Sequence, residues 1–223
     1  MTLCLNRPEK LNAIDNDMAR ALIAALAVAA EDAAVRVVVL CGNGRAFCAG
    51  RDIASAPTED DLVLVQAVSR AIVGLAKPVI AAVHGWTVGA GLEWMLNADV
   101  VIAASNARFK LPEASIGVFV TGGITATLPA YAGLARAKAL MLLGEEFSAA
   151  QAQAWGLLWR VVAPDELAPA SLAAVQTLAA LQPDIVRRFK RVLHEVGLPH
   201  FERAIGLENE AQRAIAAQAE TER

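Results

Sequence analysis

Two glutamates, Glu93 and Glu113, are the residues of this chain whose types and spacing best suit proton transfer. Glu93 comes just after a glycine-rich turn, Gly89-Ala90-Gly91, which joins an apolar run to a predicted helix. Backbone N–H groups around Ala90 would then lie at the positive end of that helix, where they can bind an anion. Two carboxylates beside one such oxyanion hole would supply acid–base chemistry next to a developing negative charge.

Each of these patterns also has a structural interpretation, which is the more common one when the pattern stands alone. A Gly-X-Gly turn between a strand and a helix usually serves packing, and a glutamate in a first helical turn usually caps the helix or interacts with its dipole. Glu113 follows Pro112 and would also suit the start of a helix. The functional interpretation therefore depends on combining these residues with a second glycine-containing segment, Gly42 to Ile53.

Strands and helices alternate through the first two thirds of the chain. Runs of mostly apolar residues over 35–40, 78–83 and 100–104, with Arg36 as the one charged residue among them, predict buried strands of a parallel sheet. A helix is predicted over 18–30, with a potential cap at Asp15-Asn16-Asp17. The order strand, glycine turn, helix recurs, which is typical of an α/β protein.

The glycines after the first of these strands do not form a nucleotide-binding motif. Gly42-X-Gly44 is followed by Phe47 at the position where the dinucleotide-binding fingerprint needs glycine. The spacing does not match the P-loop either. The sequence therefore gives little support to a nucleotide-binding fold.

The rest of the chain is predicted to be mostly helical. Helices are expected over 58–76 and 135–143, Ser148 with Gln151 forms a capping box for a helix that runs to Trp155, and a short extended segment follows at 156–162. From Pro164 onward helices are predicted over 165–181, 184–196 and 201–219. We therefore predict an α/β core over residues 1–163 and a helical subdomain over residues 164–223.

Composition narrows the class of protein. Of the 223 residues, 56% are hydrophobic, and the mean hydropathy of +0.44 indicates apolar surface buried between subunits. The net charge of −3 gives no general attraction for nucleic acid. The uncharged stretch 114–135 could cross a bilayer by length, but its glycines, proline and threonines make it a poor transmembrane helix. With no secretory signal evident, we expect a cytoplasmic protein without a membrane partner.

Cysteines and histidines predict no metal site. The cysteines at 4, 41 and 48 are odd in number and show no close pairing, and with histidines only at 84, 194 and 200 they form no zinc-binding set. We expect free thiols.

Several motifs, in order, resemble the enoyl-CoA hydratase/isomerase (crotonase) superfamily over nearly the whole chain. They are LNRPEKLNAI near the start, GNGRAFCAGRDI, KPVIAAVHGWTVGAG, Glu93 and LPEASIG. The resemblance implies an α/β fold, a crotonase-like ββα spiral core with a helical C-terminal trimerisation subdomain. It also implies that the backbone N–H groups of Arg51 and Ala90 hold the thioester oxygen of an acyl-CoA, and that Glu93 and Glu113 are catalytic.

The same resemblance implies a site for coenzyme A, which would be part of the substrate, so no separate cofactor is expected. Its candidate contacts are Lys10 and Leu11 from the turn at 7–11, and Ala49, Arg51, Asp52 and Ile53. The Arg51 side chain departs from the small residue often found there. It could reach a phosphate of coenzyme A, pair with Asp52 or point into the acyl pocket. The pocket walls are expected from 58–76 and from 119–123, where Val118 to Thr121 also departs from the pattern common among the family's hydratases.

Three functions remain open at this stage. A 2-enoyl-CoA hydratase would use both glutamates, an enoyl-CoA isomerase would need only one, and a non-catalytic relative would bind another partner or act in assembly. We favour the hydratase, with an acyl-CoA substrate and a homotrimer or dimer of trimers as the assembly. Burial and mutual repulsion should perturb the pKa of at least one of the two glutamates. Compared with family members, the chain is also expected to be shortened at both ends.

Overall fold

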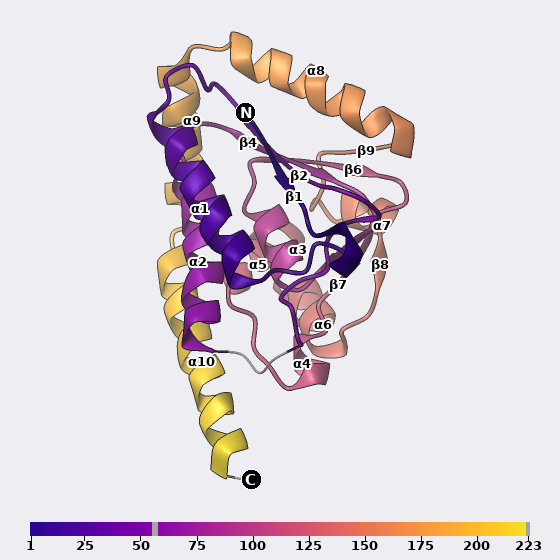
Figure 1. Cartoon of the computed structure of the whole chain (residues 1–223), viewed down its shortest axis with the longest axis vertical. Helices are drawn as coiled ribbons and strands as arrows, with labels where there is room; N and C mark the ends of the chain where they lie inside the picture. The colour runs from indigo at the N-terminus through magenta and orange to yellow at the C-terminus, as the bar shows by residue number, and fades with distance from the viewer. Residues whose placement is uncertain (55–57, 222–223) are drawn as a thin grey trace.

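A five-stranded parallel sheet forms the centre of the computed structural model, which describes residues 1–54 and 58–221 (Figure 1). Its strand order is β1 (Thr2–Leu5), β2 (Val38–Gly42), β4 (Val79–Val83), β6 (Val100–Ala104) and β9 (Arg160–Val162). All five residues of β4 are buried, because this central strand is covered on both faces. The three mostly apolar runs therefore form parallel strands, as predicted.

A second, four-stranded sheet was not anticipated from the sequence. It consists of β3 (Ala46–Cys48), β5 (Trp86–Val88), β7 (Arg108–Lys110) and β8 (Phe147–Ser148). The prediction that a helix follows at once after the 78–83 strand and its glycine turn was wrong, since β5 lies between them. Strands of two or three residues are too short to show the alternation on which strand prediction depends.

The repeating unit of the core is therefore strand, strand, helix. β2 and β3 precede α2 (Glu59–Gly74), β4 and β5 precede α3 (Ala90–Leu96), and β6 and β7 precede α4 (Glu113–Ile116). In each unit the first strand joins the five-stranded sheet and the second strand joins the four-stranded sheet. This is the ββα spiral expected from the resemblance.

Side-chain caps fix the starts of the first two helices. The Asp15 carboxylate accepts a hydrogen bond from the Met18 N–H at 2.8 Å and begins α1 (Asn16–Glu31). Thr58 and Asp61 form a reciprocal capping box at the start of α2. The other helices are α5 (Ile124–Ala132), α6 (Leu134–Leu143) and α7 (Ala149–Ala154), and short 3₁₀ turns lie at η1 (Pro8–Lys10) and η2 (Pro164–Glu166).

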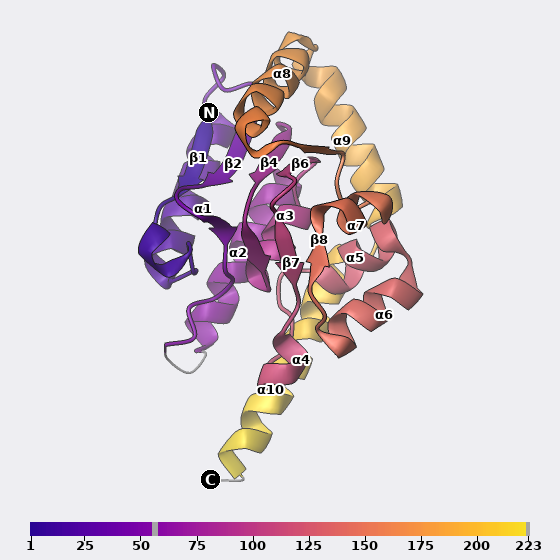
Figure 2. The ribbon, with the colours of Figure 1, turned by 90° about the vertical axis from the view of Figure 1, so that its right-hand side faces the viewer.

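Helices cover both faces of the five-stranded sheet. The main core lies between the sheet and α1, α2 and α3, and includes Leu40, Ala81 and Trp94. On the opposite face α8 (Leu167–Ala180) packs on Val37, Ile80 and Ile102, and Figure 2 shows it above the strands. Residues that alternate along β2 and β4 thus serve two different cores.

The last two helices also pack on the α/β core. Lys190 of α9 (Pro183–Gly197) is buried and donates a hydrogen bond to Asp99 at 2.8 Å. α10 (Phe201–Thr221) packs through Phe201 and Ile205 against Val73 of α2 and Ala126 of α5. The segment 164–221 is mostly helical, as predicted, and its three long helices pack against the α/β core. Within residues 1–54 and 58–221, no helix combines the length and apolar character needed to span a bilayer.

Candidate active site

The turn at Gly89 places Glu113 over the start of α3. Gly89 has a φ of 51°, and the helix begins at the next residue, Ala90. A Cβ atom at Gly89 would lie 2.5 Å from Oε1 of Glu113, so only glycine leaves room for that carboxylate. Glu113 itself begins the short helix α4, directly after β7 and Pro112. The turn and the glutamate were singled out from the sequence, and the structure brings them into contact.

Glu93 lies in the first turn of α3 and is 1% exposed. Its Oε1 accepts a hydrogen bond from the Thr121 N–H at 3.1 Å. A Cβ atom at Gly122 would come 2.4 Å from its Oε2, so the backbone of the 121–123 turn closes directly on the carboxyl group. The charge of Glu113 acts on Glu93, which places the two carboxyl groups in one electrostatic site.

Burial shifts the titration of both glutamates. It raises the pKa of Glu113 to about 7. The pKa of Glu93 is raised well above its usual value, first by burial, then by the charge of Glu208, then by that of Glu113, against the opposing effect of the Thr121 and Gly122 N–H groups. The predicted perturbation of at least one glutamate is confirmed. Carboxyl groups of this kind can hold or release a proton near neutral pH.

The backbone around Arg51 meets the backbone around Ala90. A Cβ atom at Gly50 would lie 2.8 Å from the Val88 carbonyl oxygen and 3.7 Å from the Ala90 nitrogen. Strand pairing of Ile14 with Arg51 uses the carbonyl of Gly50 and the N–H of Asp52. Because successive amides of an extended strand point to opposite sides, the Arg51 N–H is on the side away from Ile14. Segments forty residues apart in the sequence therefore converge on Ala90.

A cavity of about 850 Å³ contains these groups. Its lining includes Arg51, Ala90, Glu93 and Glu113, all four of which the sequence had proposed as oxyanion or catalytic residues. Residues expected as pocket walls also line it, Leu62 and Val65 from α2 and Phe119 and Thr121 from the 119–123 segment. The size suits a drug-sized or cofactor-sized ligand.

The candidate contacts for coenzyme A divide into two groups. Ala49, Arg51, Asp52 and Ile53 line the cavity, and Ile53 is 76% exposed at its edge. Lys10 and Leu11 do not belong to the lining, although the Leu11 carbonyl accepts a hydrogen bond from the Ala49 N–H and so holds their turn beside it.

The Arg51 side chain does not pair with Asp52. Its guanidinium donates a hydrogen bond to the Asp61 carboxylate at 2.6 Å, whereas Asp52 pairs with Arg7 at 3.1 Å. Of the three possibilities left open for this side chain, pairing with Asp52 is therefore not the one found. Asp61 lies in the first turn of α2, and no motif in the sequence singled out its contact with Arg51, ten residues earlier.

The contribution of α10 to the cavity was not predicted from the sequence. Gln212, Arg213 and Ala216 line the cavity, and the Gln212 side-chain oxygen accepts a hydrogen bond from the Phe119 N–H at 2.7 Å. Glu208 of the same helix is 1% exposed and acts on Glu93 through its charge. Its spacing from the buried Ala204 and Ile205 places it on the buried face of α10, a signal that helical periodicity could have provided.

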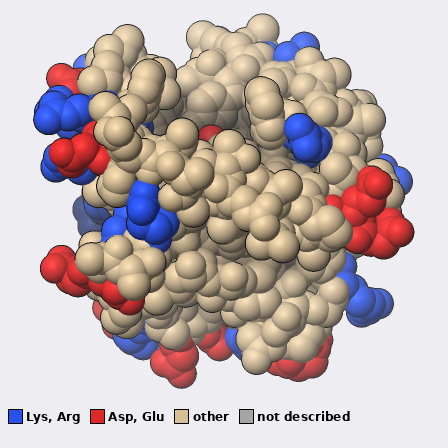
Figure 3. Space-filling view, turned by 90° about the horizontal axis from the view of Figure 1, so that it is seen from above, with Lys and Arg blue, Asp and Glu red and all other residues tan. Residues whose placement is uncertain are grey.

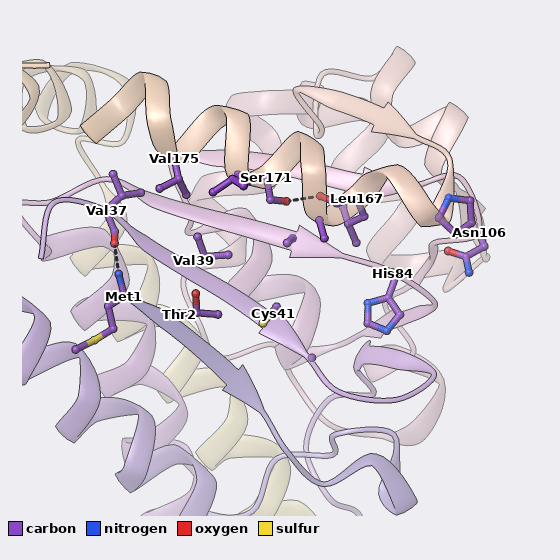
Figure 4. Close-up of a pocket in the computed structure, with 15 residues that line it drawn as sticks. Met1, Thr2, Val37, Val39, Cys41, His84, Asn106, Leu167, Ser171 and Val175 are labelled. Carbon is purple, nitrogen blue, oxygen red and sulfur yellow. Dashed lines mark hydrogen bonds between the residues drawn. The ribbon is translucent and has the colours of Figure 1, made fainter. Parts of the chain in front are cut away.

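A second cavity, of about 550 Å³, lies between α8 and the outer face of the five-stranded sheet (Figure 4). Its lining is mostly apolar, with Val37, Val39 and Val175 among the labelled side chains, and it includes Cys41 and His84. No cluster of three or more metal-ligating side chains occurs within the described residues. The paired glutamates lie in the other cavity, which is therefore the candidate active site.

Comparison with known proteins agrees with this geometry. The profile described as enoyl-CoA hydratase/isomerase matches residues 1–223. The chain is 35% identical to a 1,2-epoxyphenylacetyl-CoA isomerase of Escherichia coli, across 99% of this chain and 88% of that protein. It is 36% identical to a 2,3-dehydroadipyl-CoA hydratase of the same organism, across 87% and 78%.

Among solved structures, an enoyl-CoA hydratase from Mycobacterium avium subsp. paratuberculosis has a TM-score of 0.91 and 31% identity, and the match covers 96% of this chain and 85% of that one. The family match, the similar sequences and the shared fold all agree. The chain belongs to the enoyl-CoA hydratase/isomerase (crotonase) family.

Proposed function

We propose that this protein is an enoyl-CoA hydratase, which adds water across the 2,3 double bond of an acyl-CoA thioester. One observation carries the proposal: Glu93 and Glu113, both with raised pKa values, line the same cavity as the backbone at Ala90. Hydration needs a group that takes a proton from water and a group that gives one to carbon, and two adjacent carboxyl groups supply both.

The backbone N–H groups of Arg51 and Ala90 are proposed to bind the thioester oxygen. Negative charge develops on this oxygen as water adds to the β-carbon, and fixed donors lower the barrier only if they are aimed at it. One such donor is typically worth about 3 kcal/mol in the transition state. The close approach of Gly50 to Val88 and Ala90 supports this role, because the two backbone segments that carry these amides lie next to each other.

The proton transfers balance when the two glutamates share one proton. Protonated Glu113 gives its proton to the α-carbon, while ionised Glu93 takes a proton from the water whose oxygen bonds to the β-carbon. Repulsion and burial disfavour the doubly ionised state, which supports a single shared proton at neutral pH. Coenzyme A enters as part of the substrate, and these steps call on no further cofactor. Ala49, Asp52 and Ile53, with Lys10 and Leu11 nearby, are its proposed contacts.

An enoyl-CoA isomerase is the second candidate. It is favoured by the similarity to a protein named as an isomerase, which extends over 99% of this chain. In that reaction one carboxylate, Glu113, would remove a proton from one carbon and return it to another. No water would be held, and Glu93 would be dispensable.

The sign of an absorbance change separates the two activities. Hydration of crotonyl-CoA destroys the conjugated enoyl thioester, so its ultraviolet absorbance falls, whereas isomerisation of a 3-enoyl-CoA creates that chromophore. We expect the fall, at rates on the order of 10 per second. Glu113→Gln and Glu93→Gln should each slow it at least about a hundredfold. Glu31→Gln, a change at an exposed glutamate outside the cavity, is the matched control.

The outcomes of this experiment assign the function. A rise with 3-enoyl-CoA and no fall with crotonyl-CoA would establish the isomerase instead. A lack of turnover with short, long and aromatic enoyl-CoA substrates would favour a non-catalytic member of the family. Equal rates for the wild type and both glutamate variants would contradict the two-carboxylate mechanism.

Association into a homotrimer, or a dimer of such trimers, is proposed as well. Exposed apolar side chains support it: on α9, Phe189 is 66% exposed and Val196 is 76% exposed, and on α6, Leu142 is 72% exposed. Most of the surface seen from the α8 end is also neither acidic nor basic (Figure 3). Apolar area of this kind is typical of surfaces buried between subunits. Light scattering of the purified protein would give the number of copies.

A further inference from the structure

Glu208 is a third buried carboxyl group near the candidate active site, and the proposed reaction does not use it. It lies on α10, is 1% exposed and is absent from the cavity lining. Its Oε2 accepts a hydrogen bond from the Gly123 N–H at 2.8 Å. Its Oε1 accepts two more, from the Thr125 N–H at 2.9 Å and the Thr125 hydroxyl at 2.6 Å. Hydrogen bonds from the protein therefore replace the water that would otherwise solvate this carboxylate.

These donors belong to the N-terminal end of α5. Gly123 is the N-cap residue of that helix and has no side chain with which to cap it. The Glu208 carboxylate therefore caps α5 from another helix, where the helix dipole also favours a negative charge. Burial raises the pKa of Glu208, while the three donors from Gly123 and Thr125 act in the opposite direction and favour its ionised form.

The capped turn is closely packed on two sides. A Cβ atom at Gly123 would lie 2.3 Å from the Phe201 ring, and one at Gly122 would lie 2.4 Å from Oε2 of Glu93. The Asn97 side chain also donates a hydrogen bond to the Gly122 carbonyl at 3.1 Å. The 121–123 turn is thus held between α10 on one side and α3 on the other.

Glu93 depends on this turn for its own orientation. The Thr121 N–H donates to Oε1 of Glu93 at 3.1 Å, two residues before the Gly123 N–H that donates to Glu208. Among the described residues, the charged groups that act on Glu93 are Glu208 from α10 and Glu113 from α4. After burial, the charge of Glu208 makes the largest contribution to the raised pKa of Glu93.

We propose that Glu208 is a positioning residue of the enoyl-thioester site: its carboxylate fixes the Thr121–Gly123 turn that orients Glu93, and its charge strengthens Glu93 as the base for water. The role of Glu93 as the base for water rests on the proposed function. The effect of Glu208 on the titration of Glu93 does not depend on it.

The test is Glu208→Gln (E208Q), with Glu210→Gln, an exposed change on the same helix, as the matched control. The titration of Glu93 is followed by carbon-13 NMR of the glutamate carboxyl groups, and its resonance is identified by its loss in Glu93→Gln. We expect a lower pKa of Glu93 in Glu208→Gln than in the wild type, because a neighbouring negative charge has been removed. Glu210→Gln should leave it unchanged. An unchanged pKa in Glu208→Gln would overturn the proposal.

Kinetics then test the catalytic part. In Glu208→Gln we expect kcat for crotonyl-CoA to fall about tenfold, less than the loss of a general acid or base itself, with KM nearly unchanged. The acidic limb of the pH profile should move to lower pH, which a purely structural role would not produce. A lower pKa of Glu93 without turnover in the wild type would contradict the proposed function while supporting the coupling.

A second variant covers the case in which Glu208→Gln does not fold. Thr125→Val removes one of the three donors and keeps the carboxylate. The ionised form of Glu208 is then less stable, so the pKa of Glu93 should move in the same direction by a smaller amount. No change in Thr125→Val would count against the proposal.

Discussion

The Arg51 guanidinium donates a hydrogen bond to the Asp61 carboxylate at 2.6 Å, and this ion pair joins the strand end that supplies a proposed oxyanion amide to the first turn of α2. The same oxygen of Asp61 accepts hydrogen bonds from the N–H and the hydroxyl of Thr58, each at 2.6 Å. Asp61 therefore both caps α2 and holds the Arg51 side chain at the cavity wall.

Asp61→Asn should destabilise the protein. The change removes the ion pair and weakens the capping box, so the free energy of unfolding should fall by about 1–3 kcal/mol. Denaturant unfolding measures this loss. Asp60→Asn is the matched control, because that neighbouring carboxylate is 78% exposed and lies 3.9 Å from Arg20. Equal midpoints for the two variants would contradict the structural role given to Asp61.

Gly89→Ala should abolish hydration. Its Cβ atom would lie 2.5 Å from Oε1 of Glu113, and its φ of 51° is strained for alanine. We expect at least about a hundredfold lower kcat, because the carboxyl group must move away from the substrate. Gly133→Ala has a similar positive φ, with nothing within 4 Å of the added Cβ, and controls for backbone strain alone. Equal rates in the two variants would show that the contact is unimportant.

Most of the fold could be predicted because each of its long elements has a local signal. The strands at 78–83 and 100–104 are continuous apolar runs, and α1, α2 and α7 begin at capping residues that the sequence displays. The second sheet could not be predicted in this way. Its strands β3 and β5 have three residues each, and they are stabilised by pairing with each other rather than by any local preference.

Four residues, Arg51, Ala90, Glu93 and Glu113, were proposed from the sequence as site residues, and all four line one cavity. The Asp61 partner of Arg51 and the Glu208 cap of α5 were not proposed. Asp61 is ten residues from Arg51 and Glu208 is 85 residues from Gly123, and both contacts depend on how α2 and α10 pack. Tertiary packing of this kind is decided by shape and burial, which a pattern of residue types does not encode.

Glu113→Gln should lower the rate of hydration and make the free energy of unfolding less sensitive to alkaline pH. The folded protein binds the Glu113 proton more tightly than the unfolded chain does, since burial raises the pKa from 4.5 to about 7. Stability from this group is therefore complete below about pH 4.5 and is lost as the pH rises through about 7. The wild type should lose on the order of 3 kcal/mol over this interval relative to Glu113→Gln, which carries no titrating group.

Unfolding free energies of the two proteins, measured at about pH 5 and about pH 8, test this sign. The free energy of unfolding of Glu113→Gln should increase relative to that of the wild type as the pH rises. A constant difference between the two proteins would show that the Glu113 carboxyl titrates normally.

Lys190→Met should weaken the packing of α9 on the α/β core. The Lys190 ammonium is buried and donates hydrogen bonds to the Ile72 and Lys77 carbonyls and to Asp99. Its removal leaves two backbone carbonyls and the Asp99 carboxylate, whose side chain is 17% exposed, without this donor, so we expect a loss of about 1–3 kcal/mol in the free energy of unfolding. Arg188→Met, an exposed change on the same helix, should cost less than about 1 kcal/mol. A loss in Lys190→Met no larger than that in Arg188→Met would contradict the anchor.

The most direct test of the hydration mechanism follows the oxygen atom. Crotonyl-CoA is incubated with the wild type and with Glu113→Gln in water labelled with oxygen-18, and the products are examined by mass spectrometry. We predict that the wild type forms a 3-hydroxyacyl-CoA carrying one labelled oxygen, and that Glu113→Gln forms it at least about a hundredfold more slowly. Wild-type product with a displaced double bond and no labelled oxygen would contradict the hydration mechanism.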